Sequence, residues 1–349
     1  MDIGYVNARV RGMHSFLLDR KQLDSLILKP DLASFISDLE KTPYKQDLQL
    51  AMVTATEIRG VENALRMNLI RTFRKILSFV EGDTGEKYVH IFLTRWDIHN
   101  VKTILRGKKV SIPTQEIRSC LVPAGDLDEA TLVELLKQPD IKAVVDLLAM
   151  WGHESSIPLT RHFEEYSKTS DLVILEYALD KDYYERALRR VKGKSNDETI
   201  IRDLIATEID VTNIKSLLTL IRDGIDPEDG ERILLSGGKH LNMKQLLTML
   251  HAPTIGELLP YLEKTPYRFL IGLKAGAETH AKMSVYQNAL DRYLITHGAR
   301  IFRGDPLSIT ILIGYLWEKY TEVMNLRIIA RCKETMITPE EMEAEMIYV

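Results

Sequence analysis

The sequence predicts an all-α fold of three similar helical bundles, and three observations lead to this prediction. Apolar residues recur at steps of three and four along most of the 349-residue chain, which is the period of an amphipathic helix. Convincing strand patterns are lacking, because the best short candidate, Tyr88–Leu93, runs directly into a helical pattern. Several short phrases also occur three times at a nearly constant step, which indicates a repeated unit.

The clearest repeat is a nine-residue phrase that combines an acid, an asparagine and a base. It reads DIHNVKTIL, DVTNIKSLL and EVMNLRIIA, and its asparagines are 113 and 112 residues apart. The repeated polar positions are Asp97, Asn100 and Lys102, then Asp210, Asn213 and Lys215, then Glu322, Asn325 and Arg327.

Two further phrases keep the same step and fix the order within each unit. One contains an Ala-Leu pair and one contains a proline, and the phrase LEKTPY occurs at residues 39–44 and again at 262–267. Gly and Pro lie between the periodic stretches near Val122–Gly125 and Leu235–Leu241, as is typical of linkers. The chain is therefore predicted to contain helical units at 1–121, 122–235 and 236–349.

Within a unit, individual helices follow from periodicity and from proline. The stretch Ile58–Val80 has apolar residues at helical spacing and predicts one long helix. Thr131–Trp151 reads as two short helices separated at Pro139, with Pro139 or Asp140 opening the second. The helix that begins near Leu32 is expected to end near Thr42, because the residue before Pro43 is disfavoured in helical geometry.

The acid–asparagine–base phrase predicts a buried carboxylate. On a helix, Val101, Ile104 and Leu105 form one apolar stripe, and Asp97 falls close to its centre. An unpaired buried carboxylate would be destabilising, so we expect each acid to receive hydrogen bonds or a cation from a neighbouring helix. The base lies at i+5, a poor spacing for pairing on the same helix. Because a catalytic centre needs convergence at one place, we interpret these repeated residues as structural.

Composition excludes some classes of function. The formal net charge is −4, whereas a protein that coats nucleic acid usually carries a basic surplus, so no nucleic-acid partner is expected. Basic clusters at Arg106–Val110 and Glu185–Ser195 are interpreted as solvated helix ends or loops, with an acidic partner as the alternative. Cys120 and Cys332 lack disulfide or zinc spacing, which suits a reducing cytosol, and both are expected to be buried.

Neither a membrane span nor a signal peptide is predicted. The N-terminal apolar stretch is interrupted by arginines, and the longest nearly apolar run, Pro306–Trp317, is well short of the ~20 residues that a spanning helix needs. We therefore expect a soluble protein whose membrane contact is made through a partner.

Motifs of catalysis are also lacking, so no catalytic, cofactor-binding or metal-binding residue and no cofactor is predicted. Glu81–Tyr88 and Ser236–Leu241 contain glycine and lysine, but neither fits a phosphate-binding P-loop, and both are read as loops that end helices. The nine histidines show no metal-ligand spacing, and no G-x-S-x-G sequence occurs.

Three features of the sequence resemble a known protein family. The N-terminal segment Tyr5–Leu18, with Ala8–Arg11 inside it, the triple acid–asparagine–base phrase and Leu105–Lys108 are similar to the C subunit of archaeal and bacterial A/V-type rotary ATP synthases. The d subunit of the vacuolar ATPase is the eukaryotic relative. The resemblance covers the whole chain, and one departure is Gly12, where the family pattern suggests Ala.

The resemblance implies both a shape and a mechanical role. Three units would surround a pseudo-threefold axis as a funnel on the rotor ring, at the cytoplasmic face of the membrane. Its cavity would receive the D and F subunits of the central stalk. The protein would be a peripheral, non-catalytic rotor part that transmits torque for ATP synthesis or for proton or sodium transport. The alternative is a helical scaffold or adaptor of another assembly, and an enzyme with an unrecognised site in a helical cleft is a third interpretation.

Overall fold

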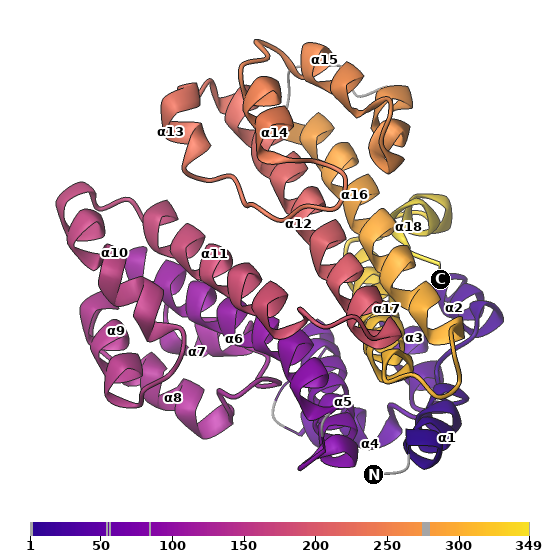
Figure 1. Cartoon of the computed structure of the whole chain (residues 1–349). Helices are drawn as coiled ribbons and strands as arrows, with labels where there is room; N and C mark the ends of the chain where they lie inside the picture. Colours follow the sequence, from indigo (N-terminus) through magenta and orange to yellow (C-terminus); the bar gives the residue numbers. More distant parts are fainter. Residues whose placement is uncertain (1–2, 54, 56, 84, 274–279, 349) are drawn as a thin grey trace. The chain divides into compact units, whose positions relative to one another are not determined.

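The computed structural model describes residues 3–53, 55, 57–83, 85–273 and 280–348. Within these ranges the elements are all helices, which confirms the predicted all-α class (Figure 1). The α-helices are α1 Ile3–His14, α2 Arg20–Ile27, α3 Leu32–Leu39, α4 Lys45–Ala51, α5 Glu57–Val80, α6 Glu86–Lys109, α7 Thr114–Ser119, α8 Glu129–Lys137, α9 Ile141–Met150, α10 Ser156–Thr169, α11 Val173–Arg190, α12 Asn196–Asp223, α13 Pro227–Glu231, α14 Met243–Leu250, α15 Ile255–Leu258, α16 His280–Arg300, α17 Thr310–Glu334 and α18 Pro339–Glu345. Short 3-10 helices span Leu259–Leu262, Pro266–Gly272 and Ile301–Arg303.

The helices form two compact units. One combines Met1–Tyr183 with Ala299–Val349, and the other is the continuous segment Tyr184–Gly298. The limits fall inside α11 and near the end of α16, so each of these helices contributes to both units. The division into three sequence units stays a prediction.

The first unit is built around α5, α6 and α17. Helix α17 packs along α5, and α1, α2 and α3 also contact α17. Leu65, Leu105 and Leu326 are fully buried and come from the three long helices, so these helices supply the centre of this core. Cys332 is buried on α17, but Cys120 is exposed, so the expected burial of both cysteines is wrong for Cys120.

The second unit is built around α12 and α16, which run side by side (Figure 1). Helices α14 and α15 contact α12, and α13 packs against α14. Ile214, Leu217 and Leu290 are fully buried in this unit. Helix α12 carries the second copy of the acid–asparagine–base phrase, as α6 and α17 carry the first and third copies.

Side-chain hydrogen bonds near the ends of helices help to determine where those helices begin and end. The predicted pair of short helices is α8 and α9, and the Asp140 carboxylate caps α9 by accepting the Ala143 N–H at 2.8 Å. Helix α3 ends at Leu39, three residues before the expected end, because a turn begins at Glu40 and the Thr42 hydroxyl donates to the Leu39 carbonyl at 2.6 Å. No helix in the described ranges has both the length and the apolar character that crossing a membrane requires.

Candidate functional site

The first copy of the repeated phrase anchors a loop to α6. Asp97 is completely buried, and its carboxylate accepts the N–H groups of Asp126 at 2.8 Å and Leu127 at 3.0 Å. Both donors lie in the loop before α8, so the carboxylate of one copy binds the backbone that opens the next copy.

The second copy repeats this arrangement within its own unit. Asp210 on α12 is completely buried and accepts the N–H groups of His240 at 2.8 Å and Leu241 at 3.2 Å. It also accepts a hydrogen bond from the Tyr267 hydroxyl at 3.0 Å. Three donors therefore converge on this carboxylate, one more than on Asp97.

The acid of the third copy binds residues of the N-terminal segment. Glu322 on α17 is 5% exposed and accepts the Leu18 N–H, the Tyr44 hydroxyl at 2.5 Å and the Lys319 ammonium at 2.7 Å. The expected hydrogen bonds are present in all three copies. A cation bonds to the carboxylate only in this copy, and it comes from the same helix.

The repeated asparagines make a second, identical attachment. Each side-chain amide donates to the carbonyl and accepts from the N–H of a single residue 22 positions later, at 2.7 to 2.9 Å. This pair of hydrogen bonds satisfies both the N–H and the carbonyl group of a buried backbone residue. The pairs are Asn100 with Val122, Asn213 with Leu235 and Asn325 with Ile347. We call each acid, asparagine and bound backbone a clasp.

The electrostatics of the clasps differ from copy to copy. Burial raises the pKa of Asp97 to about 7, and the two backbone N–H groups oppose this rise only in part. Burial also raises the pKa of Asp210, against its backbone donors and the Tyr267 hydroxyl. The pKa values of Tyr44 and Tyr267 are themselves raised, first by burial and then by the facing carboxylates, so both phenols stay protonated and donate.

The repeated bases form ion pairs in two copies. Lys102 lies 2.8 Å from Asp180 on α11, and Lys215 lies 2.6 Å from Asp291 on α16. Arg327 has no ion pair or hydrogen bond with any residue that the structure describes.

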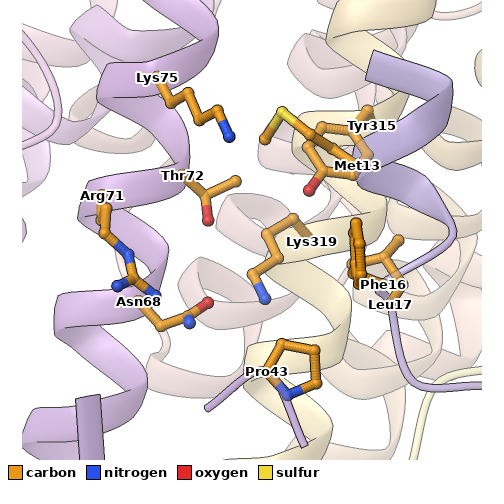
Figure 2. A pocket seen from close by; sticks show the side chains of 10 residues that line it. All are labelled: Met13, Phe16, Leu17, Pro43, Asn68, Arg71, Thr72, Lys75, Tyr315 and Lys319. Carbon is orange, nitrogen blue, oxygen red and sulfur yellow. The ribbon is translucent and has the colours of Figure 1, made fainter. Parts of the chain in front are cut away.

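A pocket of about 340 Å³ lies in the first unit (Figure 2). Figure 2 shows Thr72 and Lys75 on α5 directed toward α17, across from Met13 and Tyr315. Its lining residues are Met13, Phe16, Leu17, Pro43, Asn68, Arg71, Thr72, Lys75, Tyr315 and Lys319.

The pocket has a cationic side and an apolar side. Arg71 is paired with Asp47 at 2.7 Å, and Lys319 with Glu322 at 2.7 Å. The lining residues include no carboxylate, histidine or cysteine. Across the described residues, no cluster of His, Cys, Asp and Glu could hold a metal ion.

The fold and the clasps together define a helical protein whose repeated acids and asparagines fix other backbone segments to long helices. Comparison with known proteins is specific. The family model described as ATP synthase (C/AC39) subunit matches residues 6–345. This chain is 31% identical to the C subunit of the A-type ATP synthase of Methanococcoides burtonii, over 98% of this chain and 93% of the relative. It is 30% identical to the C subunits of the A-type ATP synthases of Methanocaldococcus jannaschii, over 98% and 86%, and Halorubrum lacusprofundi, over 98% and 97%. The chain therefore belongs to the ATP synthase (C/AC39) subunit family, and the resemblance found in the sequence is confirmed.

Sequence reasoning missed the partners of the repeated residues. Tyr44 and Tyr267 end the two copies of LEKTPY, and both donate to a clasp carboxylate. Asp180 and Asp291 directly follow the repeated Ala-Leu pair and bind the repeated lysines. The signal was present, because a residue that recurs at the same step as the acid or the base is a candidate partner for it.

Proposed function

We propose that the chain is a non-catalytic central-stalk subunit of an A-type rotary ATP synthase. In this role it links the shaft, formed by the D and F subunits, to the proteolipid ring in the membrane, and it transmits torque between them. Family membership and the full-length relatives, which are C subunits of A-type ATP synthases, support the proposal.

The cyclic order of the clasps is the observation that carries the proposal. Asp97 of the first phrase binds the loop at Asp126, and Asp210 of the second phrase binds the loop at His240. Glu322 of the third phrase binds Leu18 and Tyr44, 304 and 278 residues away, so in the predicted division each acid binds the following unit in turn. A linear array would leave its last copy without a partner, whereas a cycle of three suits bundles arranged about a pseudo-threefold axis. A funnel of this kind would offer the shaft a central cavity.

Torque transmission requires stiffness, and the clasps are suited to this. Each fixes a loop to a long helix through buried hydrogen bonds, which are hard to break without leaving unsatisfied groups. The protein would lie at the cytoplasmic face of the membrane and contact the lipid bilayer only through the ring.

Co-purification from membranes tests the proposal. The chain is tagged and captured from detergent-solubilised membranes of its own cells, and the recovered proteins are identified by mass spectrometry. Proteolipid and the D and F subunits are expected in stoichiometric amounts. Removal of the chain is expected to leave ATP hydrolysis by the soluble sector but to abolish ATP-driven ion transport. Recovery of an unrelated assembly, or transport that persists without the chain, would contradict the proposal.

A further inference from the structure

In the first two copies, the repeated lysine pairs with an aspartate that occupies an equivalent position on a neighbouring helix. Helix α6 packs on α11 through two ion pairs one turn apart: Lys102 with Asp180 at 2.8 Å, and Arg106 with Glu176 at 2.6 Å. In the second unit Lys215 pairs with Asp291 at 2.6 Å. Both aspartates directly follow the repeated Ala-Leu pair, so they occupy equivalent positions.

In the third copy the same register brings two cations together. Arg331 pairs with Glu62 at 2.6 Å, and these residues are equivalent to Arg106 and Glu176, so α17 packs on α5 in the register of α6 on α11. One turn earlier, Arg327 replaces the repeated lysine, and Arg66 replaces the aspartate that follows the Ala-Leu pair.

Neither arginine is satisfied by the described residues. The Arg327 Nε is buried and makes no hydrogen bond. The Arg66 Nε is also buried without a partner, while its Nη1 donates to the Leu121 carbonyl at 3.2 Å. Burial lowers the pKa of the Arg66 guanidinium; the charge of Glu129 opposes this change, and the charges of Arg118 and Arg327 add to it. The register of α17 on α5, fixed by Arg331 and Glu62, places Arg66 and Arg327 at the positions where Asp180 and Lys102 face each other in the first copy.

The surroundings leave a positive surplus. Glu129 lies 3.9 Å from Arg66, but it already pairs with Arg118 at 2.9 Å. Burial lowers the pKa of His99, the hydrogen bond to the Cys120 carbonyl opposes this, and nearby cations including Arg327 lower the pKa further, which favours the neutral imidazole. Three arginines and one glutamate thus carry a formal charge of about +2, comparable to that of a phosphate dianion with opposite sign. Buried unpaired charge is destabilising, so this surplus calls for a counter-ion.

We propose that Arg66 and Arg327 form a binding site for a phosphate-class oxyanion, which supplies the negative charge that Asp180 and Asp291 supply in the other two copies. Guanidinium groups are planar forks whose N–H groups match the spacing of phosphate oxygens. The Arg66 side chain is 15% exposed and the Arg118 side chain is 46% exposed, so Arg66 is the more shielded of these two arginines. Free phosphate and the phosphate groups of a nucleotide share this chemistry.

Thermal unfolding and calorimetry of the full chain test the site. Inorganic phosphate is compared with sodium chloride at matched ionic strength in a phosphate-free buffer. Phosphate is expected to raise the melting temperature of the natural chain above the chloride value and to bind with a stoichiometry near one. Arg66→Asp restores the residue of the other two copies, so this variant is expected to fold, to be at least as stable in chloride, and to bind phosphate at least tenfold more weakly.

A matched control separates the site from the change in net charge. Arg161 is exposed on α10, and Arg161→Asp changes the charge equally, so this variant is expected to keep the phosphate response of the natural chain. Arg66→Gln serves as a second loss variant should Arg66→Asp fail to fold. Tighter binding of ADP than of phosphate would assign the site to a nucleotide, and equal or weaker binding to the free anion. Equal effects of phosphate and chloride on the natural chain, or an undiminished phosphate response in the foldable Arg66 variant, would overturn the proposal.

Discussion

The three clasp carboxylates show how one buried acid can be satisfied in different ways. Asp97 relies on two backbone N–H groups, Asp210 adds the Tyr267 hydroxyl, and Glu322 combines one N–H with Tyr44 and a lysine. His153 stands where the other copies have these tyrosines, and its Nδ1 accepts the Ser155 N–H at 3.2 Å. Loss of the phenol leaves Asp97 as the carboxylate whose charge is least supported by direct donors.

Asp97 is expected to make folding stability dependent on pH. Its pKa rises from 3.8 to about 7 on folding, so the folded chain binds the proton more tightly than the unfolded chain. The resulting stability is fully present below pH 3.8 and is lost as the pH rises toward 7. The free energy of unfolding of the natural chain, measured relative to Asp97→Asn by urea titration, should therefore fall by about 3 kcal/mol between pH 4 and pH 7.

Asp146→Asn provides the control for this experiment. Asp146 is 62% exposed on α9, where it pairs with Lys142, and the corresponding difference for this variant should stay within about 0.5 kcal/mol over the same range. A difference between the natural chain and Asp97→Asn that is flat with pH would contradict the raised pKa.

Removal of a clasp phenol should destabilise the chain. Tyr267→Phe deletes the hydroxyl that donates to Asp210 and leaves a buried carboxylate with one donor fewer, at a cost of about 1–3 kcal/mol. Tyr44→Phe should cost more, because this hydroxyl also accepts a hydrogen bond from Lys319 at 2.8 Å. Chemical denaturation measures both, and Tyr261→Phe, at a side chain that is 51% exposed, should change stability by less than about 0.5 kcal/mol. Equal effects at Tyr261 and Tyr267 would argue against the assigned role.

The sequence predicted that these acids are buried, but it did not identify the groups that donate hydrogen bonds to them. The position of Asp97 on the apolar stripe follows from helical geometry alone. Its donors lie about 30 residues away in a loop, and those of Glu322 lie at the other end of the chain, where helical periodicity carries no information about contact.

At the scale of elements, the loops approach the clasp acids closely because they contain glycine. A Cβ atom at Gly125 would lie 2.2 Å from an Asp97 carboxylate oxygen, and one at Gly238 would lie 2.1 Å from Asp210. No side chain fits at such distances. The acid of the third copy, Glu322, is one methylene group longer than aspartate and accepts the Leu18 N–H.

Two glycine-to-alanine substitutions should therefore have opposite effects. Gly238→Ala places a Cβ against both Asp210 and the Leu241 carbonyl, and it should destabilise the chain by about 2–4 kcal/mol, since the loop must move and the clasp must open. Gly12→Ala meets nothing within 4 Å on α1 and should stabilise it by about 0.5–1 kcal/mol through helix propensity. Melting curves compare them, and destabilisation by Gly12→Ala or tolerance of Gly238→Ala would contradict the geometry.

Helix existence was predictable, whereas some helix ends were not. Long periodic segments such as α5 appear where the pattern placed them, and Pro139 separates α8 from α9. The early end of α3 depends on a side-chain hydrogen bond from Thr42 to Leu39, a local contact that competes with the helix and that periodicity does not register.

At the scale of the whole molecule, the two ends of the chain meet in one unit. Arg20 on α2 pairs with Glu343 on α18 at 3.2 Å and lies over the ring of Tyr348. Asn325 holds Ile347 by two hydrogen bonds, so the last residues are attached to α17. The C-terminal segment therefore contributes to the same core as the N-terminal helices.

Truncation after Thr335 should reveal this attachment. Loss of α18 and Ile347 leaves the Asn325 amide without its backbone partner and should lower the melting temperature by several degrees. Asn325→Ala should cost about 2–4 kcal/mol in the full chain but little in the truncated one, because the two changes remove the same hydrogen bonds. Additive effects in this double-mutant cycle, measured by denaturant unfolding, would contradict a role of Asn325 through Ile347.

The bond between Glu322 and Tyr44 also has a consequence during protein synthesis. The ribosome completes Tyr44 278 residues before it adds Glu322, a delay of about 14 to 56 s at typical rates of translation. The earliest helices of the nascent chain therefore leave the exit tunnel before the residue that completes their hydrogen bonding has been synthesised.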